Sequence, residues 1–494
     1  MTKDDARDGM LETEQSVAVG ALSAGGNTGE KEGVIRKIIN GFKADFPEDF
    51  QLAEGRAHVI AIAWPAMLES FLLNLASMVN MLMVGSLGTW AIASVGYCTQ
   101  PRMLVASVFQ AFNTGATALV ARAKGAKDPE EANAIMHQSL MFAICASVIL
   151  AVLGYRYANA MVVFMGASEE QTIAASTQYM RVVMITFPAN AISLCITALL
   201  RGIGKTRASM LYNVIANAVN ISVGFVFISG RFGMPAQGVR GAALGLGTGQ
   251  IVAACIAVIT VIRSADMLKL SVKSLFKPNM LVLKRITNIG TPAMFEQLCM
   301  RGGNIMFTKI VATLGTTAFA THQIAMNVHQ LTFMNGQAFG VSATSLLGQS
   351  LGRKRPDQGK AEVQLCRRYS LALSLTIATC FVFLGRQIVG LYTTDAEVIA
   401  IGARLLLIVA LLQPFQSSQQ VLAGALRGAG DTKAVAICAF VGVVAIRPIL
   451  GYLLTIQYGF ELYGVWITLV VDQMTRSTYT MWRFISDKWK TLKV

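Results

Sequence analysis

The sequence predicts an all-α membrane protein in which twelve transmembrane helices form two pseudo-symmetric lobes of six helices each. Three observations lead to this fold class. Of the 494 residues, 54% are hydrophobic and 14% are charged, whereas about 25% of the residues in soluble domains are charged. Apolar stretches of about 20 residues, long enough to cross a hydrocarbon core of ~30 Å, recur along the chain. The first half of the sequence is also repeated in the second half.

The repeat has an offset of 227 residues, which falls to 226 further along the chain. Residues 65–93 read PAMLESFLLNLASMVNMLMVGSLGTWAIA, and residues 292–320 read PAMFEQLCMRGGNIMFTKIVATLGTTAFA, so the offset is 292 − 65 = 227. It pairs Glu69 with Glu296, and a second match pairs the Leu-Arg-Gly of residues 200–202 with that of residues 426–428, at 226. A period this long indicates two copies of one structural unit.

Twelve apolar stretches are expected to cross the membrane. They cover residues 58–84, 91–120, 134–157, 174–200, 208–230 and 239–263 in the first half, and residues 286–312, 318–349, 366–392, 399–425, 433–456 and 462–485 in the second. Because each half has an even number of spans, the halves are parallel repeats related by an axis along the membrane normal. Two such bundles facing each other would leave a cleft at the bilayer midplane.

The connections between the spans alternate in charge. One set is basic and includes the mid-chain linker, whereas the other set is short and neutral or acidic. The positive-inside rule therefore places both termini and the linker in the cytosol of a multi-pass plasma (inner) membrane protein. The predicted parts are a disordered cytosolic tail (1–54), an N-terminal lobe (55–263), a cytosolic linker (264–285), a C-terminal lobe (286–487) and a cytosolic tail (488–494).

Other classes of protein find little support. The net charge of +15 belongs to the membrane-flanking connections, so we expect no nucleic-acid partner. The eight cysteines include no CxxC pair, which argues against a metal site. No HExxH or GxSxG motif indicates an enzyme, and the segment GIGKT at residues 202–206 lacks the first glycine of a phosphate loop. We expect a monomer without metal or cofactor, whose partners are a small-molecule substrate and membrane lipids.

Two acidic residues are the leading candidates for a functional site. Glu69 and Glu296 lie about eleven residues into their spans, which corresponds to a depth of ~16 Å, near the bilayer centre. A charge there costs about 2.5–3.5 kcal/mol and normally faces the bundle interior or a water-filled cavity. We predict that both acids couple transport to a proton or another cation. The alternative is a structural carboxylate bonded to a neighbouring helix, for example through Arg301 or Arg102.

Prolines and amides complete the set of candidate residues. Hinges are predicted at Pro65 and Pro292, one turn before the acids, and deeper in the fourth and tenth spans at Pro188 and Pro414. For the first two, a proline tolerated in the first helical turn is the alternative. Gln323 and Asn327 are four residues apart and share a helix face, where they either line a cavity or join helices. Asp472, Arg447 and Arg476, in the last two spans, are expected to form an internal ion pair.

Taken together, several motifs resemble the multidrug and toxic compound extrusion (MATE) family over residues 55–487. They are MVGSLGTWAIA at residues 83–93, LGTTAFATHQIAMN at 314–327, the paired LRGIGKT at 200–206 and LRGAGDT at 426–432, and FGMPAQGVRGAA at 232–243. The resemblance implies a V-shaped pair of six-helix lobes. It also implies efflux of large amphipathic, often cationic compounds in exchange for Na⁺ or H⁺.

The chain departs from this family at two positions. Members commonly place an Asp near the end of the first helix, where this chain has Asn80, and several place an Asp in the tenth helix, where this chain has Gln413 and Gln416. The resemblance therefore leaves ion coupling to Glu296 and Glu69. Asn80, Gln413 and Gln416 then become candidates for the substrate cavity, together with Gln323 and Asn327.

The expected function is secondary antiport by alternating access, which needs no cofactor beyond the coupling ion. The nearest alternative is a flippase for lipid-linked saccharides, or an exporter of anionic metabolites. Either would require a basic central cavity, for which the candidates are Arg102, Arg181, Arg301 and Lys309.

Overall fold

The computed structural model describes residues 50–167, 169–230, 233–263, 267–275 and 277–492. Most of the expected N-terminal tail, residues 1–49, lies outside this part of the chain. The described residues form helices and no strands, and twelve long helical segments cover all twelve expected spans. The expected fold is therefore confirmed.

The first half contains α3 (Leu52–Gly85), α4 (Thr89–Ala126), α5 (Pro129–Arg156), the short α6 (Ala158–Phe164), α7 (Glu170–Gly202), α8 (Thr206–Ser229), α9 (Gly238–Arg263) and the single-turn α10 (Val272–Leu275). The second half contains α11 (Met280–Ala312), α12 (Thr316–Gly352), α13 (Pro356–Gly390) and α14 (Ala396–Gly428). It continues with one segment made of α15 (Thr432–Ala439), η1 (Phe440–Ile446), α16 (Arg447–Tyr452) and η2 (Leu453–Gln457), and ends with α17 (Glu461–Ile485) and η3 (Lys488–Thr491).

Nine helical segments of the described chain are both long and apolar enough to cross a membrane, judged by length and composition. The other three long helices, α11, α12 and α17, are of similar length but richer in polar residues. They can be accommodated in a membrane where their polar faces lie against other helices.

Several helices begin before the expected span, and α13 differs most, since it begins at Pro356 instead of residue 366. Two other differences concern the first helix of each lobe. Helices α3 and α11 each begin six residues before the expected span, at Leu52 instead of residue 58 and at Met280 instead of residue 286. The end of the expected linker, residues 280–285, is therefore helical. Apolarity marks only the part of a helix that faces lipid, whereas the Asn279 side chain, which accepts hydrogen bonds from the Leu281 and Val282 backbone amides, marks the start of α11.

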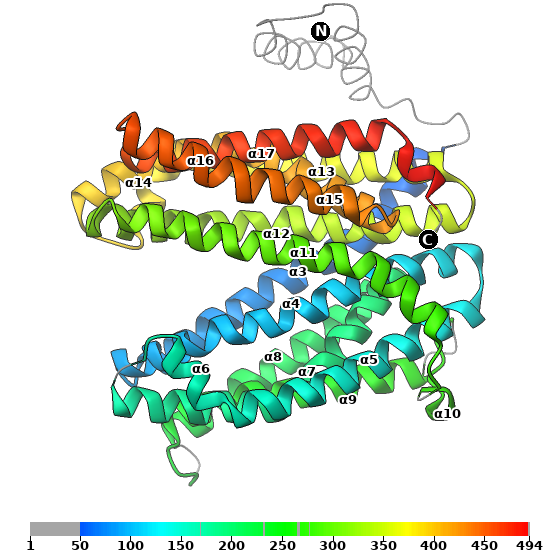
Figure 1. Cartoon of the computed structure of the whole chain (residues 1–494), viewed down its shortest axis with the longest axis horizontal. Helices are drawn as coiled ribbons and strands as arrows, with labels where there is room; N and C mark the ends of the chain where they lie inside the picture. The colour runs from blue at the N-terminus through cyan, green and yellow to red at the C-terminus, as the bar shows by residue number, and fades with distance from the viewer. Residues whose placement is uncertain (1–49, 168, 231–232, 264–266, 276, 493–494) are drawn as a thin grey trace, which may run out of the picture.

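Figure 1 shows two lobes, with α3 to α9 below and α11 to α17 above. The first helix of each lobe crosses toward the other lobe. At the start of α3, Val59 and Ile62 are buried in the hydrophobic core of the C-terminal lobe. At the start of α11, Ile286 and Ile289 are buried in the core of the N-terminal lobe. The two pairs are equivalent, because 286 − 59 and 289 − 62 are both 227. The first turns of each lobe's first helix therefore pack in the core of the other lobe; we call these two stretches the exchanged segments.

A side-chain contact between the lobes fixes each of these segments: a hydrogen bond between a histidine and a carboxylate for α3, and an ion pair for α11. His58 of α3 has Nδ1 2.8 Å from Oε1 of Glu362 in α13. Its repeat equivalent, Arg285 of α11, has Nη1 2.7 Å from Oε1 of Glu131 in α5. Both contacts join the two lobes at the same end of the molecule.

At this end, which we call the closed end, the lobes meet backbone against backbone. A Cβ atom added to Gly125 of α4 would lie 1.9 Å from the carbonyl oxygen of Gln349 in α12. One added to the equivalent Gly352 would lie 2.0 Å from the carbonyl oxygen of Arg122. Only glycine allows this approach. Toward the opposite end, which carries the α3–α4 connection, the lobes diverge in Figure 1.

Candidate functional site

Glu69 lies at the junction of three helices of the N-terminal lobe. Its side chain is 1% exposed, and Oε1 lies 2.8 Å from Nη2 of Arg201, in the last turn of α7. Asn213 of α8 donates to Oε1 through Nδ2 at 2.5 Å, and the Ser209 hydroxyl lies 3.4 Å from Oε2. These donors supply the compensation that a buried carboxylate needs.

Glu296 has the equivalent arrangement in the C-terminal lobe. Arg427, in the last turn of α14, donates through Nη2 to Oε1 at 2.5 Å and through Nε to Oε2 at 3.3 Å. Both partners are equivalent between the lobes, because 296 − 69 = 227 and 427 − 201 = 226. The duplicated unit therefore preserves a glutamate–arginine pair and not the acid alone.

The partners of the two glutamates are not the expected Arg301 and Arg102 but Arg201 and Arg427. Arg301 does not contact either glutamate in the described hydrogen bonds; it donates to the sulfur of Met103 at 3.4 Å. Arg201 binds Glu69 and Arg427 binds Glu296 instead. Because Arg201 lies in the last turn of α7 and Ser209 in the first turn of α8, Glu69 lies near the α7–α8 connection. Its position near the bilayer centre stays a prediction.

A signal for both arginines was present in the sequence. The motif Leu-Arg-Gly occurs at the ends of the fourth and tenth expected spans, with nearly the same offset as the two glutamates. Both arginines lie in the basic connections, where they were expected to mark the cytosolic side. A long side chain at a helix end can also turn back into the bundle and bind a carboxylate there.

A small pocket of about 210 Å³ opens beside Glu69, between α3 and α8. Its polar lining comes from Glu69, Asn213 and Asn217, and its apolar lining comes from Leu72, Leu73, Leu75, Ala76, Val79, Val214, Ala218 and Ile221. Carboxylate and amide oxygens can bind a hard cation, and a carboxylate can accept a proton. Either cation would have to compete with Arg201 for the same carboxylate.

Each glutamate–arginine pair lies beside a hydrogen bond between the lobes. The carbonyl oxygen of Gly202, next to Arg201, accepts from the Ser345 hydroxyl at 2.9 Å and from Nε2 of Gln349 at 3.1 Å. On the other side, the carbonyl oxygen of Ala429 accepts from Nη2 of Arg122 at 3.2 Å. Arg122 and Gln349 are repeat equivalents, because 349 − 122 = 227. A change in either pair can therefore reach the contact between the lobes through a short stretch of chain.

The five predicted cavity residues lie in three places. Gln413 donates to the Thr332 hydroxyl at 2.8 Å, and Oε1 of Gln416 is 3.1 Å from Nε2 of His329, so both join α14 to α12 inside the C-terminal lobe. Gln323 and Asn327 share an exposed face of α12, and Nδ2 of Asn327 donates to the Gln323 carbonyl oxygen at 3.0 Å. Asn80 is half-buried on α3, and its Oδ1 lies near Gly224 of α8. The described structure therefore does not assemble them into one site, and their role in binding stays a prediction.

All four predicted hinge prolines lie inside helices. Pro65 is in α3, Pro188 in α7, Pro292 in α11 and Pro414 in α14. A first-turn position for Pro65 and Pro292 is therefore wrong. The ring of Pro65 leaves the carbonyl oxygen of Ala61 without its usual helical donor, and the Thr206 hydroxyl lies 3.4 Å from this oxygen.

A fifth proline is associated with a larger irregularity that the sequence analysis missed. Pro448 lies between the π-helical segments Phe440–Ile446 and Leu453–Gln457. It has no backbone N–H to donate, and π-helical turns are rare and often found at functional sites. This segment is an additional candidate for bending.

The expected internal ion pair in the last two spans is confirmed. Asp472 is fully buried, and its Oδ2 accepts from Nε of Arg447 at 2.8 Å and from Nη2 of Arg476 at 3.1 Å. Arg447 also donates to Oδ1 of Asn304 at 3.0 Å. This cluster connects α11, α16 and α17.

No contact described in the structure joins the four basic residues considered for an anion cavity. The guanidinium of Arg181 lies 5.4 Å from the centre of the Tyr155 ring, and Arg301 contacts Met103. Lys309 is exposed on α11, and Arg102 is half-buried on α4. The described side chains also contain no group of three or more His, Cys, Asp or Glu residues placed to hold a metal ion.

Comparison with known proteins identifies the family. The family model described as MatE matches residues 65–226 and 292–453, two copies at the offset of 227 found in the sequence. A probable multidrug resistance protein NorM of Thermotoga maritima is 28% identical over 91% of this chain and 96% of that protein. An uncharacterized transporter, YisQ of Bacillus subtilis, is 25% identical over 86% of this chain and 93% of that protein.

Solved structures share the fold. A multidrug resistance MATE family transporter in an outward-facing conformation has a TM-score of 0.81 at 19% identity, covering 89% of this chain and 97% of that one. A variant of the Vibrio cholerae MATE transporter VcmN has a TM-score of 0.82 at 18% identity, covering 89% and 98%. The two relatives are named as a probable multidrug resistance protein and as a transporter, and neither name is that of an enzyme. The chain is therefore a multi-pass membrane protein that belongs to the MatE family of multidrug efflux transporters.

Proposed function

We propose that this protein exports amphipathic, mostly cationic drugs or metabolites in exchange for Na⁺ or H⁺ by alternating access. The observation that carries the proposal is the pair of equivalent glutamate–arginine contacts, each beside a hydrogen bond that holds the closed end together. We further propose that the protein acts as a monomer, without a cofactor, and that its partners are its small-molecule substrate and membrane lipids, not nucleic acid.

The coupling step is a competition for each carboxylate. When Na⁺ or H⁺ binds Glu69 or Glu296, the paired arginine loses its counter-charge, and the last turn of α7 or α14 loses one of its fixed contacts. The carbonyl oxygens that accept hydrogen bonds from the other lobe belong to Gly202, at the end of α7, and to Ala429, the residue that follows α14. Cation binding therefore weakens the closed end and favours the conformation open there. Only such differential binding lets a gradient shift the equilibrium between the two states.

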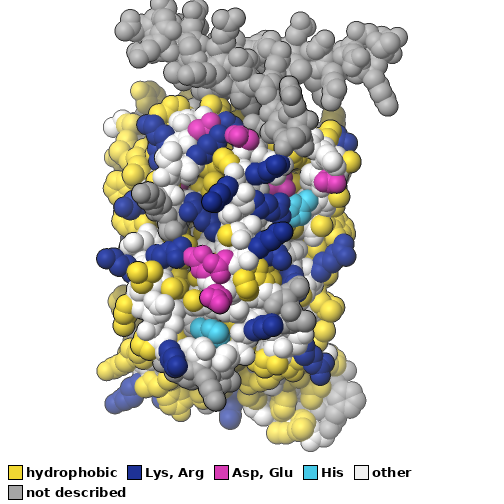
Figure 2. All heavy atoms as spheres, turned by 90° about the vertical axis from the view of Figure 1, so that its right-hand side faces the viewer, with side chains coloured by type: hydrophobic (Ala, Val, Ile, Leu, Met, Phe, Trp, Pro, Cys, Tyr) yellow, Lys and Arg dark blue, Asp and Glu magenta, His cyan; other side chains and the backbone are white. Residues whose placement is uncertain are grey.

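The closed end is proposed to face the cytosol of a plasma (inner) membrane. Figure 2 views the molecule from this end and shows many more Lys and Arg than Asp and Glu side chains. Cytoplasmic connections carry such an excess of positive charge. Both chain termini would then lie in the cytosol, and the diverging ends of the lobes would face outward.

The exchange of first turns gives Pro65 and Pro292 a specific role as hinges. Each lies just after the segment buried in the opposite lobe, so separation of the lobes at the closed end must bend α3 and α11 near these residues. We expect Pro65→Ala, combined with Pro292→Ala, to lower the transport rate about tenfold or more while leaving the melting temperature equal or higher, because alanine restores helical hydrogen bonds. The measurement is drug efflux from proteoliposomes together with thermal unfolding. Transport at the wild-type rate would remove these two prolines from the mechanism.

The proposed function is tested by transport in proteoliposomes with the sodium and proton gradients imposed separately. We expect one of the gradients to drive movement of a cationic dye, and collapse of that gradient to stop it. A rival function is export of anionic metabolites. The cluster of Arg447, Arg476 and Asp472 has two positive charges and one negative charge, which favours an anion. A panel of anionic dyes tests this rival. Selective transport of anions, with no response to either cation gradient, would replace the proposal.

A further inference from the structure

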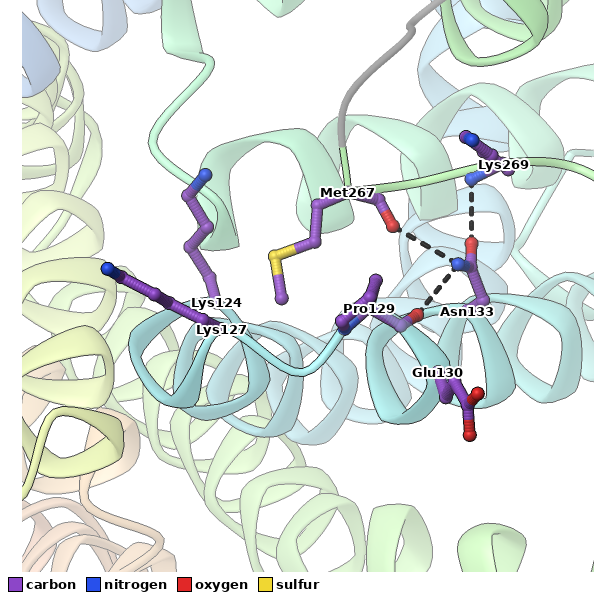
Figure 3. A pocket seen from close by; sticks show the side chains of 7 residues that line it. All are labelled: Lys124, Lys127, Pro129, Glu130, Asn133, Met267 and Lys269. Carbon is purple, nitrogen blue, oxygen red and sulfur yellow. Dashed lines mark hydrogen bonds between the residues drawn. The ribbon is translucent and has the colours of Figure 1, made fainter.

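A second polar site lies at the closed end, away from the glutamate–arginine pairs. It is a pocket of about 540 Å³ where α4 ends and α5 begins, lined by Lys124, Lys127, Pro129, Glu130, Asn133, Met267 and Lys269. Figure 3 shows Lys124 and Lys269 on either side of Met267, while Glu130 points away from the lysines. No carboxylate lies between Lys124 and Lys269 in this view, and Lys127 extends away from Met267.

The wall formed by the linker is held in a fixed position. Asn133 of α5 donates through Nδ2 to the carbonyl oxygen of Met267 at 3.1 Å and accepts from the backbone amide of Lys269 at 2.6 Å. Between these two residues, Leu268 is 1% exposed and belongs to the core of the N-terminal lobe. The linker therefore holds Met267 and Lys269 beside the start of α5.

At the equivalent place in the C-terminal lobe, lysine side chains form ion pairs with carboxylates of the chain itself. Lys360 is the equivalent of Asn133, because 360 − 133 = 227. Its Nζ lies 3.0 Å from Oδ1 of Asp487, and Nζ of Lys490 lies 2.8 Å from Oδ1 of Asp357. Burial lowers the pKa of Lys490, but hydrogen bonds to Asp357 and Asp487 outweigh this effect and raise it. Here the chain itself supplies both carboxylates, Asp357 from the first turn of α13 and Asp487 from the segment that follows α17.

The lysines of the pocket in the N-terminal lobe have no such ion pairs in the described part of the chain. Among the residues that the structure describes, no carboxylate forms an ion pair with Lys124, Lys127 or Lys269. Three lysines and a single carboxylate, that of Glu130, line the pocket, so its net positive charge attracts an anion from outside the described chain.

We propose that this pocket binds the phosphate group of an anionic phospholipid. Helix α4 ends at Ala126, α5 begins at Pro129 and α9 ends at Arg263, so three membrane-spanning helices end near the pocket, at the level of lipid headgroups. Ile259 and Ile262, in the last turns of α9, are 46% and 61% exposed and can contact acyl chains below the headgroup. Basic pockets between membrane helices on the cytoplasmic side bind such headgroups.

The test is lipid binding to the purified full-length chain in neutral detergent, followed by native mass spectrometry. Each lysine near an anionic surface is worth about fivefold in affinity, so the triple variant K124Q/K127Q/K269Q should bind dioleoylphosphatidylglycerol about 100-fold more weakly. The matched control R353Q/K354Q/K433Q removes three exposed basic residues from the same end of the other lobe and should bind like the wild type. The charge-preserving variant K124R/K127R/K269R should retain binding.

Three results would overturn the proposal. Equal losses in the two glutamine variants would mean diffuse attraction to the basic end, and equal binding of dioleoylphosphatidylcholine would mean that the negative charge is not recognised. Displacement of the bound lipid by millimolar inorganic phosphate would identify a free anion as the ligand. A wild-type preference for phosphatidylglycerol that only the pocket glutamine variant loses supports the proposal.

Discussion

Replacing Glu296 with glutamine should abolish cation-driven efflux and also lower the stability of the protein. The substitution leaves the Arg427 guanidinium without its carboxylate in a site where the arginine side chain is only 21% exposed. Removing one partner from a fully buried ion pair costs about 3–5 kcal/mol, and the residual exposure of Arg427 reduces this to about 2 kcal/mol. The measurements are gradient-driven drug efflux in proteoliposomes and thermal unfolding of the purified variant.

The double variant Glu296→Gln/Arg427→Gln separates the two effects. It restores charge balance, so we expect most of the lost stability to return while cation-driven efflux remains absent. Recovery of both stability and transport would mean that the pair only supports the fold. The equivalent variants at Glu69 and Arg201 should behave in the same way, with a larger loss of stability in Glu69→Gln, because Asn213 and Ser209 also donate to Glu69 and glutamine keeps only one acceptor oxygen.

Replacing Gly125 with valine should prevent the lobes from meeting at the closed end. A Cβ atom at this position would lie 1.9 Å from the backbone carbonyl oxygen of Gln349, and a backbone atom in a helix cannot turn aside as a side chain can. The variant should remain folded in the conformation open at this end and lose at least ~90% of its transport activity, because alternating access requires both states. Hydrogen exchange measured by mass spectrometry should show faster exchange in residues 345–356.

Gly96 provides a matched control in the same helix. A Cβ atom added there meets no other atom within 4 Å, so Gly96→Val should keep wild-type transport and exchange. If both valine variants behave alike, helix propensity and not the contact between lobes explains the effect. Slow exchange at residues 345–356 in Gly125→Val would show that the lobes can close by another path.

The sequence predicted the helices and the equivalence of Glu69 and Glu296, because apolar stretches and repeat offsets are local properties of the chain. It could not predict that α3 and α11 exchange their first turns. The apolar faces of Val59 and Ile286 require burial, but a pattern of apolar residues does not indicate which lobe provides it. The tight contact at Gly125 was likewise invisible, since many glycines of the chain meet open space.

The arginine partners were predictable in principle. Arg201 and Arg427 occupy equivalent motifs, yet a basic residue at the end of a span is most often a cytosolic anchor. Only the fold shows that their side chains return toward α3 and α11. The pairing of Gln413 and Gln416 with α12 could not be deduced either, because an amide within a span is equally suited to a cavity or to a hydrogen bond between helices.

The central claim is that cation binding at Glu69 and Glu296 releases the closed end. The most direct test measures the distance between spin labels at Ala126 and Arg353, both exposed at that end, by pulsed electron paramagnetic resonance in a cysteine-free background. The coupling ion, Na⁺ or H⁺, should raise the population with a longer distance in the otherwise wild-type protein and leave the Glu69→Gln/Glu296→Gln variant unchanged. The same ion dependence in the variant, or no change in either protein at concentrations that drive transport, would contradict the account.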